Sequence, residues 1–257
     1  VLQAGKETHE GMARAVHAVM LQAIKHYDPY LAETIHNTSS VKPFTASDVF
    51  MWQEHYMIRL TATTRSVAQA LERALRSDGI LAPRARLDLA GAQFEVAAAA
   101  TRPEAHPWAG QTAYSNLAMP WLYRHYAPTS RLTLEFASPV TFKSNDMNIP
   151  VPMPAWVFGS LSEKWNAFAP TPLPESLREF AATQVALSRY DLRTVAMPFK
   201  DGAMKFGAVG VATYTAPRSD SALWYALHLL ADFAFYAGVG AGTTMGLGQC
   251  RKMNNEE

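Results

Sequence analysis

Apolar residues recur at helical spacing over residues 10–27 of the chain. The stripe consists of Met12, Val16, Val19, Met20, Ala23, Ile24 and Tyr27, which is the periodicity of an amphipathic helix. Asp28 and Pro29 follow, and this pair is typical of a helix N-cap and a first-turn proline. The pattern therefore predicts one helix over 10–27 and a short second helix over 28–36.

Residues 54–63 change to strict alternation, with Tyr56, Ile58, Leu60 and Ala62 on one face, as in a half-buried strand. Residues 64–77 return to helical spacing with Val67, Leu71 and Leu75 inward. Residues 86–100 alternate again, and Gly91 marks a turn or bulge within them. The first half thus contains helices over 10–36, a strand over 54–63, a helix over 64–77 and strands over 86–100. It matches the order of elements in the second half if one more strand lies at or before residues 1–5. Because the chain begins at Val and not at Met, we expect residues upstream of Val1.

The second half repeats this order. It predicts a strand over 131–142, a helix over 153–168, strands over 188–199 and 203–216 around Asp201-Gly202, a helix over 221–236 and a last strand over 249–252. Asp-Gly is a strong hairpin signal. Strand, helix, hairpin, helix, strand is the split βαβ order of a ferredoxin-like unit. We therefore predict an α+β protein with two tandem ferredoxin-like domains, residues 1–128 and 129–257.

Composition narrows the class of protein. The 257 residues are 49% hydrophobic and 18% charged with a net charge of +1, which fits a globular protein and leaves any polyanion site to a local patch. No apolar run reaches the roughly 18 residues of a membrane span, and the opening residues do not read as a signal peptide. The chain has one cysteine, so we expect no internal disulfide, no multi-cysteine zinc site and a cytoplasmic location.

Five glycines lie in the segment GVGAGTTMGLG, residues 238–248. Glycine at such density suggests positive φ angles or the close approach of another molecule. A dinucleotide-binding fingerprint would follow a strand, whereas this segment follows a predicted helix, and a Walker loop would contain a lysine. Two interpretations stay open: a tight helix-to-strand connection, or a surface of backbone N–H groups that contacts phosphates.

Two distant segments together resemble one family. The form G-h-G, five residues, G-h-G of residues 238–248 and the segment HAVMLQAIKHYDPYLAETIHNTSSVKPFTAS, residues 17–47, are similar to the CRISPR-associated endoribonucleases that cut repeat RNA, Cas family six. Weaker similarities of the same kind are SPVTF at 138–142 and HPWAGQTAY at 106–114. The resemblance spans nearly the whole chain.

The resemblance implies a mechanism and a set of residues. The general acid or base would be His36, the histidine of the Ile-His dipeptide, and Lys42 would support the cleavage site electrostatically. Some relatives use a tyrosine in the first helix, where this chain has Leu21. The implied partner is CRISPR repeat RNA, or precursor crRNA. Other Cas proteins of an effector complex and a second copy of the chain, in a homodimer, are further candidate partners.

Metal-free RNA cleavage is chemically consistent with these residues. The RNA supplies the 2′-hydroxyl nucleophile, histidine transfers protons near neutral pH, and a lysine stabilises the charged transition state. No His/Cys/Asp cluster has metal-ligand spacing, so no metal or cofactor is expected. Among eight histidines His55, on a strand face, is second to His36. Candidate RNA contacts are Gly238, Gly240, Gly242, Gly246, Gly248, Arg59, Arg65, Lys143, Arg251 and Lys252. The alternative function is a non-cleaving RNA-binding subunit of a CRISPR ribonucleoprotein.

Overall fold

The computed structural model describes residues 1–4, 12–38, 41–124, 128–198, 204–217 and 221–253. Its contacts group the chain into two units. Unit 1 holds residues 1–111 and 244–246, and unit 2 holds residues 112–243 and 247–257. The units differ from the expected domains in two segments: residues 112–128 belong with unit 2, and residues 244–246 of the glycine loop belong with unit 1.

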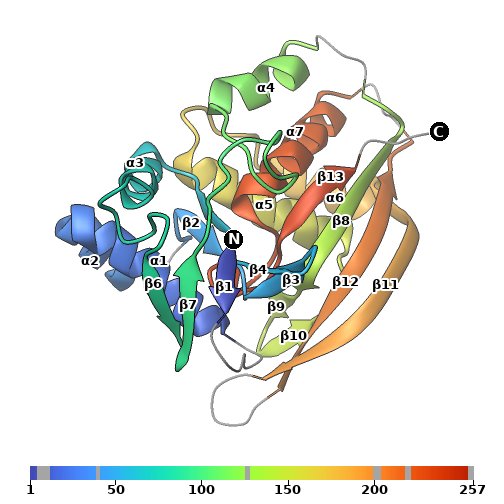
Figure 1. Cartoon of the computed structure of the whole chain (residues 1–257). Coiled ribbons are helices and arrows are strands. Elements are labelled where there is room, and N and C mark those ends of the chain that lie inside the picture. The colour runs from blue at the N-terminus through green and yellow to red at the C-terminus, as the bar shows by residue number, and fades with distance from the viewer. Residues whose placement is uncertain (5–11, 39–40, 125–127, 199–203, 218–220, 254–257) are drawn as a thin grey trace. The chain divides into compact units, whose positions relative to one another are not determined.

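Unit 1 begins with β1 (Leu2–Ala4), α1 (Ala13–Tyr27) and α2 (Pro29–Asn37). Asp28 caps α2 as predicted, because its Oδ1 accepts from the backbone N–H of Leu31 at 2.8 Å. A hairpin follows, formed by β2 (Phe44–Ala46), β3 (Phe50–Trp52), β4 (His55–Met57) and β5 (Leu60–Ala62). The unit ends with α3 (Arg65–Ala74), β6 (Arg86–Leu89) and β7 (Ala92–Val96) (Figure 1).

The sheet of unit 1 runs β3-β4-β1-β7-β6, and β2 pairs with β5 beside it. The predicted strand over 54–63 is thus divided into β4 and β5. The hairpin shifts its register by one residue between the two parts, since Ala46 pairs with Leu60 but Phe50 pairs with Met57. Such a one-residue insertion is a β-bulge. Without the extra edge strand β6, the order is that of a ferredoxin-like sheet, with β1 between β4 and β7.

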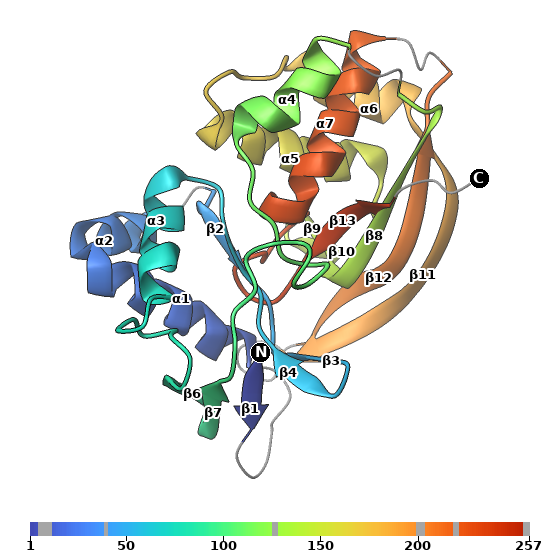
Figure 2. The ribbon, with the colours of Figure 1, turned by 45° about the horizontal axis from the view of Figure 1, so that its top comes forward.

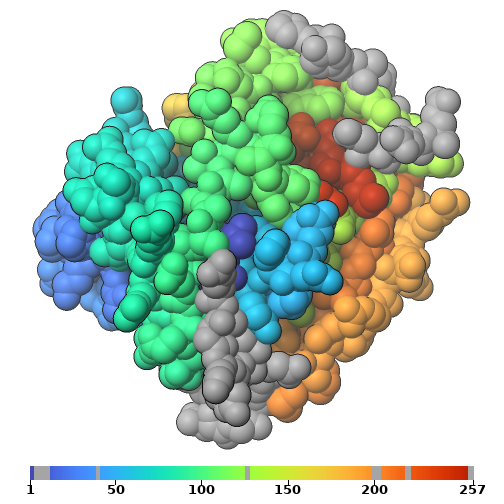
Figure 3. Space-filling view, in the orientation of Figure 1, coloured from blue at the N-terminus to red at the C-terminus, as the bar shows by residue number. Residues whose placement is uncertain are grey.

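Unit 2 contains α4 (Tyr114–Leu122), β8 (Arg131–Val140), β9 (Phe142–Ser144), β10 (Met147–Ile149), α5 (Pro154–Phe168) and α6 (Ser176–Gln184). It continues with β11 (Ala186–Pro198), β12 (Met204–Thr215), α7 (Ala222–Ala237) and β13 (Cys250–Met253). Its antiparallel sheet has the order β11-β12-β8-β13. The helices cover one face of this sheet (Figure 2), and β11 forms an open edge (Figure 3).

Each unit has a hydrophobic core of its own. In unit 2, Leu132, Leu134 and Phe136 alternate inward from β8, as predicted, against α5 and α7. In unit 1, α1 buries Val16, Met20 and Ile24 within the core. The predicted α+β class with two tandem ferredoxin-like folds is confirmed.

The structure contains helices α4 and α6 and the β9–β10 hairpin, which the sequence pattern did not predict. The predicted turn at Asp201-Gly202 lies outside the described residues, although the strands on both sides of it pair in register. In the part of the chain that the structure describes, no helix is long and apolar enough to cross a membrane.

Candidate active site

His36 lies in the last turn of α2, and its side chain is exposed. Its neighbour Ile35 is buried in the core of unit 1 at 4% exposure. Because Ile35 packs into the core, this turn of the helix is held in place and the side chain of His36 points outward. The structure therefore presents the predicted histidine at the surface, as proton transfer with a bound ligand requires.

Lys42 reaches back to the end of α2. Its Nζ donates to the backbone carbonyls of Ile35 and Thr38, and it lies 3.3 Å from the carbonyl oxygen of His36. The last carbonyls of a helix have no partner within the helix, and a cation there also interacts favourably with the helix dipole. Burial lowers the pKa of Lys42 from its usual value. The lysine thus holds the helix turn that carries His36.

A second histidine, on α1, lies in the same region. His17 of α1 is half-buried, and its Nδ1 lies 2.9 Å from the carbonyl oxygen of Thr244 in the glycine loop. Its ring packs against Phe44 of β2, with the centroids 5.5 Å apart. Burial lowers the pKa of His17, the bond to Thr244 opposes this, and the charges of Lys42 and His36 lower it further. The contact joins residues 227 positions apart, so no local pattern predicts it.

The other histidines are placed differently. His55, the second candidate, is exposed on β4. His228 is buried at 1% exposure between the rings of Trp121 and Trp224, and burial lowers its pKa to about 3. His228 is therefore a core residue.

All five glycines of the 238–248 loop have positive φ, between 61° and 88°. Space also requires glycine at two of them. A Cβ on Gly240 would lie 2.4 Å from the carbonyl oxygen of Thr141, and one on Gly248 would lie 2.0 Å from that of Val239. The glycine density therefore has a conformational cause, as expected from the sequence.

Most N–H groups of these glycines bond within the protein. Gly238 donates to Ala234, Gly240 to Ser160, Gly246 to Ala46 and Gly248 to Pro139. The N–H groups of residues 242–245 have no acceptor among the described residues. The donors that could meet a phosphate are thus at the tip of the loop, and a role of the five glycines as RNA ligands stays a prediction.

A buried lysine supports the start of the loop. Lys164 of α5 is 9% exposed, and its Nζ lies 3.2, 2.9 and 3.3 Å from the carbonyl oxygens of Ala237, Gly238 and Gly240. Burial lowers the pKa of Lys164 to about 7, which the charge of Glu163 opposes. Sequence reasoning missed this residue because it lies in the predicted helix 153–168 as a single charge without a motif.

Two predicted RNA contacts in the described chain have very different surroundings. Arg59 is 9% exposed, its Nε donates to the carbonyl of Trp108 at 2.8 Å, and its guanidinium lies 5.4 Å from the centre of that ring. These contacts make Arg59 part of the packing of unit 1. Lys143 is exposed on β9. Burial lowers the pKa of Lys205, and the positive charge of Lys143 lowers it further. Of the two, Lys143 remains open to a phosphate.

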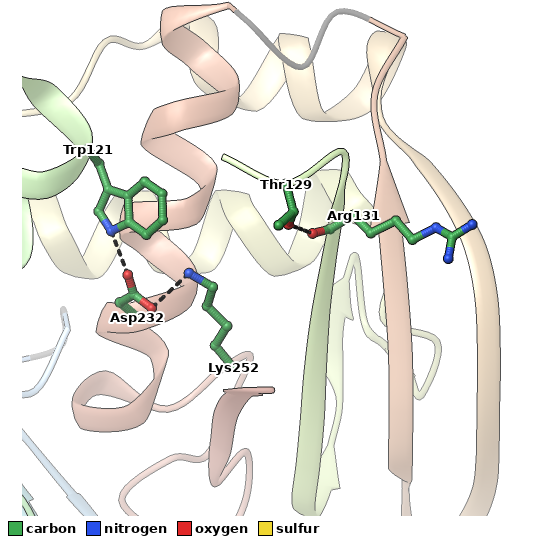
Figure 4. Close-up of polar contacts among 5 residues, drawn as sticks. All are labelled: Trp121, Thr129, Arg131, Asp232 and Lys252. Atoms are coloured by element: carbon green, nitrogen blue, oxygen red, sulfur yellow. Dashed lines mark hydrogen bonds and ion pairs between the residues drawn. The ribbon is translucent and has the colours of Figure 1, made fainter. Parts of the chain in front are cut away.

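The two predicted RNA contacts on β13, Arg251 and Lys252, form ion pairs with acidic residues. Arg251 Nε lies 2.5 Å from Glu135 Oε2. Lys252 Nζ lies 3.1 Å from Asp232 Oδ1 and 4.2 Å from the centre of the Trp121 ring, and Trp121 donates to the same carboxylate (Figure 4). A phosphate would have to compete with these carboxylates. Among the described residues, no three His, Cys, Asp or Glu side chains gather as metal ligands would.

The second half of the chain matches a known family in sequence. Residues 134–250 match the model of the CRISPR-associated endoribonuclease Cas6. The chain is also 33% identical, over 126 residues, to a CRISPR-associated endoribonuclease Cas6 of Mycobacterium tuberculosis. That alignment covers 48% of this chain and 39% of the length of the relative.

Solved structures match nearly the whole chain. A Cas6 product complex is 25% identical, covers 98% of both chains and has a TM-score of 0.80. Thermus thermophilus Cas6 is 26% identical, covers 98% of both chains and has a TM-score of 0.73. The resemblance expected from the two sequence segments is confirmed: the chain is similar in sequence to the CRISPR-associated endoribonuclease Cas6 and similar in fold to solved Cas6 structures.

Proposed function

We propose that this protein is a metal-independent endoribonuclease that cleaves CRISPR repeat RNA and so converts precursor crRNA into mature crRNA. The observation that carries the proposal is the position of His36. It is exposed at the end of α2, in a turn whose carbonyls are bound by Lys42. The match in fold to a Cas6 product complex supports the same substrate class.

The reaction needs few protein groups. The RNA 2′-hydroxyl attacks the neighbouring phosphorus, the bond to the 5′-oxygen breaks, and the products are a 2′,3′-cyclic phosphate and a 5′-hydroxyl. His36 transfers a proton in this reaction, which typically contributes roughly 10²–10⁴-fold to the rate. Lys42 assists in two ways: it orders the His36 turn through backbone carbonyls, and its positive charge favours the anionic transition state.

RNA binding draws on other residues. Lys143 on β9 is exposed and supplies a phosphate contact. The N–H groups at the tip of the glycine loop, residues 242–245, supply neutral donors. Arg59, Arg251 and Lys252 contribute less, because each is already engaged within the protein. Phosphate contacts provide most of the affinity of such complexes and make it dependent on salt.

One assay tests the proposal. End-labelled repeat RNA is incubated with the protein in excess EDTA, and the fragment ends are identified. We expect a single cut in the repeat, a 2′,3′-cyclic phosphate on the upstream fragment and no effect of EDTA. If the protein binds the repeat but leaves it intact with and without Mg²⁺, it is a non-cleaving RNA-binding subunit.

A further inference from the structure

Helix α5 holds the start of the glycine loop with two side chains one turn apart. The Oγ of Ser160 accepts from the N–H of Gly240 at 3.1 Å, and Nζ of Lys164 lies 3.3 Å from the carbonyl oxygen of the same glycine. Nζ also lies 3.2 and 2.9 Å from the carbonyl oxygens of Ala237 and Gly238. Because residues four positions apart share one face of a helix, a single face of α5 binds both polar groups of Gly240.

Lys164 also reaches the tip of the loop. Its Nζ lies 3.5 Å from the Oγ1 of Thr243, a residue that is 9% exposed. A Cβ on Gly238 or on Gly248 would lie only 3.0 or 3.1 Å from the Cγ2 of Thr243, so this side chain is packed inside the loop. Thr243 belongs to residues 242–245, whose N–H groups have no acceptor among the described residues. One ammonium group thus connects the start of the loop to the segment with donors for a phosphate.

The protonation of Lys164 determines how many of these bonds it can form. An ammonium group has three N–H donors, one for each of the three carbonyls. A neutral amine has two donors and a lone pair, so one carbonyl loses its donor. Burial lowers the pKa of Lys164 to about 7, which the charges of Glu163 on α5 and of Cys250 on β13 oppose. From α7 and the loop, the groups that Nζ contacts are carbonyls and the Thr243 hydroxyl, which carry no charge.

We propose that Lys164 is a positioning residue for RNA: its ammonium group holds the glycine loop in the form that donates to phosphates. It is buried and acts through the backbone of the loop. A phosphate bound at the tip brings a negative charge towards Nζ, and an opposite charge favours the charged form of a lysine. RNA binding therefore favours protonation of Lys164, and protonation favours RNA binding to the same degree. This inference rests on the proposed function and adds a dependence on pH to the affinity for RNA.

Binding experiments with three variants test this role. The RNA is the repeat with 2′-deoxyribose at the nucleotide before the cut, so that it has no nucleophile there and stays intact. Affinity is measured at pH 7 and pH 9, and thermal unfolding is followed at both. Lys164→Met removes the charge, Lys164→Arg keeps a charge that does not titrate in this range, and Ser160→Ala removes the neutral anchor of the same loop. Groups such as Cys250 titrate in every variant, so differences between variants isolate Lys164.

For the wild type we expect the affinity to fall by about fivefold or more from pH 7 to pH 9, within the range of coupling between sites. Ser160→Ala should fall in parallel with the wild type. Lys164→Met should bind weakly and Lys164→Arg tightly, each with little change between the two pH values. The contribution of Lys164 to stability rises over the same range, because the unfolded state binds more protons there. A loss of affinity therefore does not come from unfolding.

The opposite results separate this inference from the proposed function. A wild-type affinity that does not change with pH, or the same change in Lys164→Met as in the wild type, would overturn the inference alone. If Lys164→Met does not fold, an equal pH dependence of the wild type and Lys164→Arg would overturn it. A wild type that shows the expected pH dependence but leaves unmodified repeat RNA intact would overturn the proposed function and support the inference. Absence of binding at both pH values would overturn both.

Discussion

The ammonium group of Lys164 lies 2.9 Å from the carbonyl oxygen of Gly238, the residue that ends α7 and begins the glycine loop. It also reaches the carbonyls of Ala237 and Gly240. One buried side chain thus satisfies several carbonyls at a helix end where the backbone turns through positive φ. The shape of the loop depends on a residue of α5, about 75 positions earlier in the chain.

Replacing Lys164 by Met should therefore destabilise the fold. The methionine fills similar space but leaves the carbonyls without donors, which costs about 1–3 kcal/mol for a buried group. Urea denaturation measures the change in the free energy of unfolding. Lys25→Met, on the exposed face of α1, is the control and should stay within about 0.5 kcal/mol of the wild type. An equally small change for Lys164→Met would mean that the loop does not need this lysine.

Stability should depend on pH through the same residue. The pKa of Lys164 falls from 10.5 to about 7 in the folded protein because of burial. Between these two values the unfolded state binds more protons than the folded state, so the free energy of unfolding rises with pH. Comparing the wild type with Lys164→Met at pH 7 and pH 9 isolates this contribution. The advantage of the wild type should be greater at pH 9, and an advantage that shrinks would contradict the shift.

Gly240→Ala should destabilise the protein more than Gly91→Ala. Both positions have positive φ, 76° and 90°, so both substitutions strain the backbone. Only at Gly240 would the new Cβ also meet a backbone oxygen, at 2.4 Å, because nothing lies within 4 Å of a Cβ on Gly91. We expect a loss of more than about 2 kcal/mol at Gly240 and about 1 kcal/mol at Gly91. Equal losses, measured by urea denaturation, would show that strain alone determines the cost.

Lys42→Met tests how the lysine acts. Because its Nζ binds the carbonyls at the end of α2, its loss should loosen the turn around His36. We expect cleavage to slow by about tenfold or more, within the range that one positioned group contributes. Hydrogen exchange of the amides of residues 35–38 should become faster. Slower cleavage with unchanged exchange would contradict the ordering role and leave Lys42 only its electrostatic role at the phosphate.

The periodicity of the sequence predicted most of the fold because each unit repeats one order of elements. The alternation of Leu132, Leu134 and Phe136 and the cap at Asp28 are local signals, and both are present in the structure. The strand predicted over 54–63 is divided because a bulge near Ser47 shifts the pairing. Strand pairing with a distant segment decides such a feature, so the alternation of a single strand cannot predict it.

The site was predictable only in part, for a similar reason. The segment Ile35-His36 and the lysine after it are close in sequence, and the structure brings Lys42 to the carbonyl of His36. The contacts of His17 with Thr244 and of Lys164 with Gly238 join distant parts of the chain. Arg59 is a candidate RNA contact in the sequence, but its contact with the Trp108 ring follows only from the fold.

The rate of His36→Ala on cognate repeat RNA, in EDTA and under single-turnover conditions, tests the central claim most directly. The account predicts a fall of roughly 10²-fold or more, while His55→Ala, an exposed histidine of β4, cuts at the wild-type rate. RNA affinity should change little in either variant, because phosphate contacts elsewhere provide most of it. A wild-type rate for His36→Ala, or a wild-type reaction that EDTA abolishes, would contradict the account.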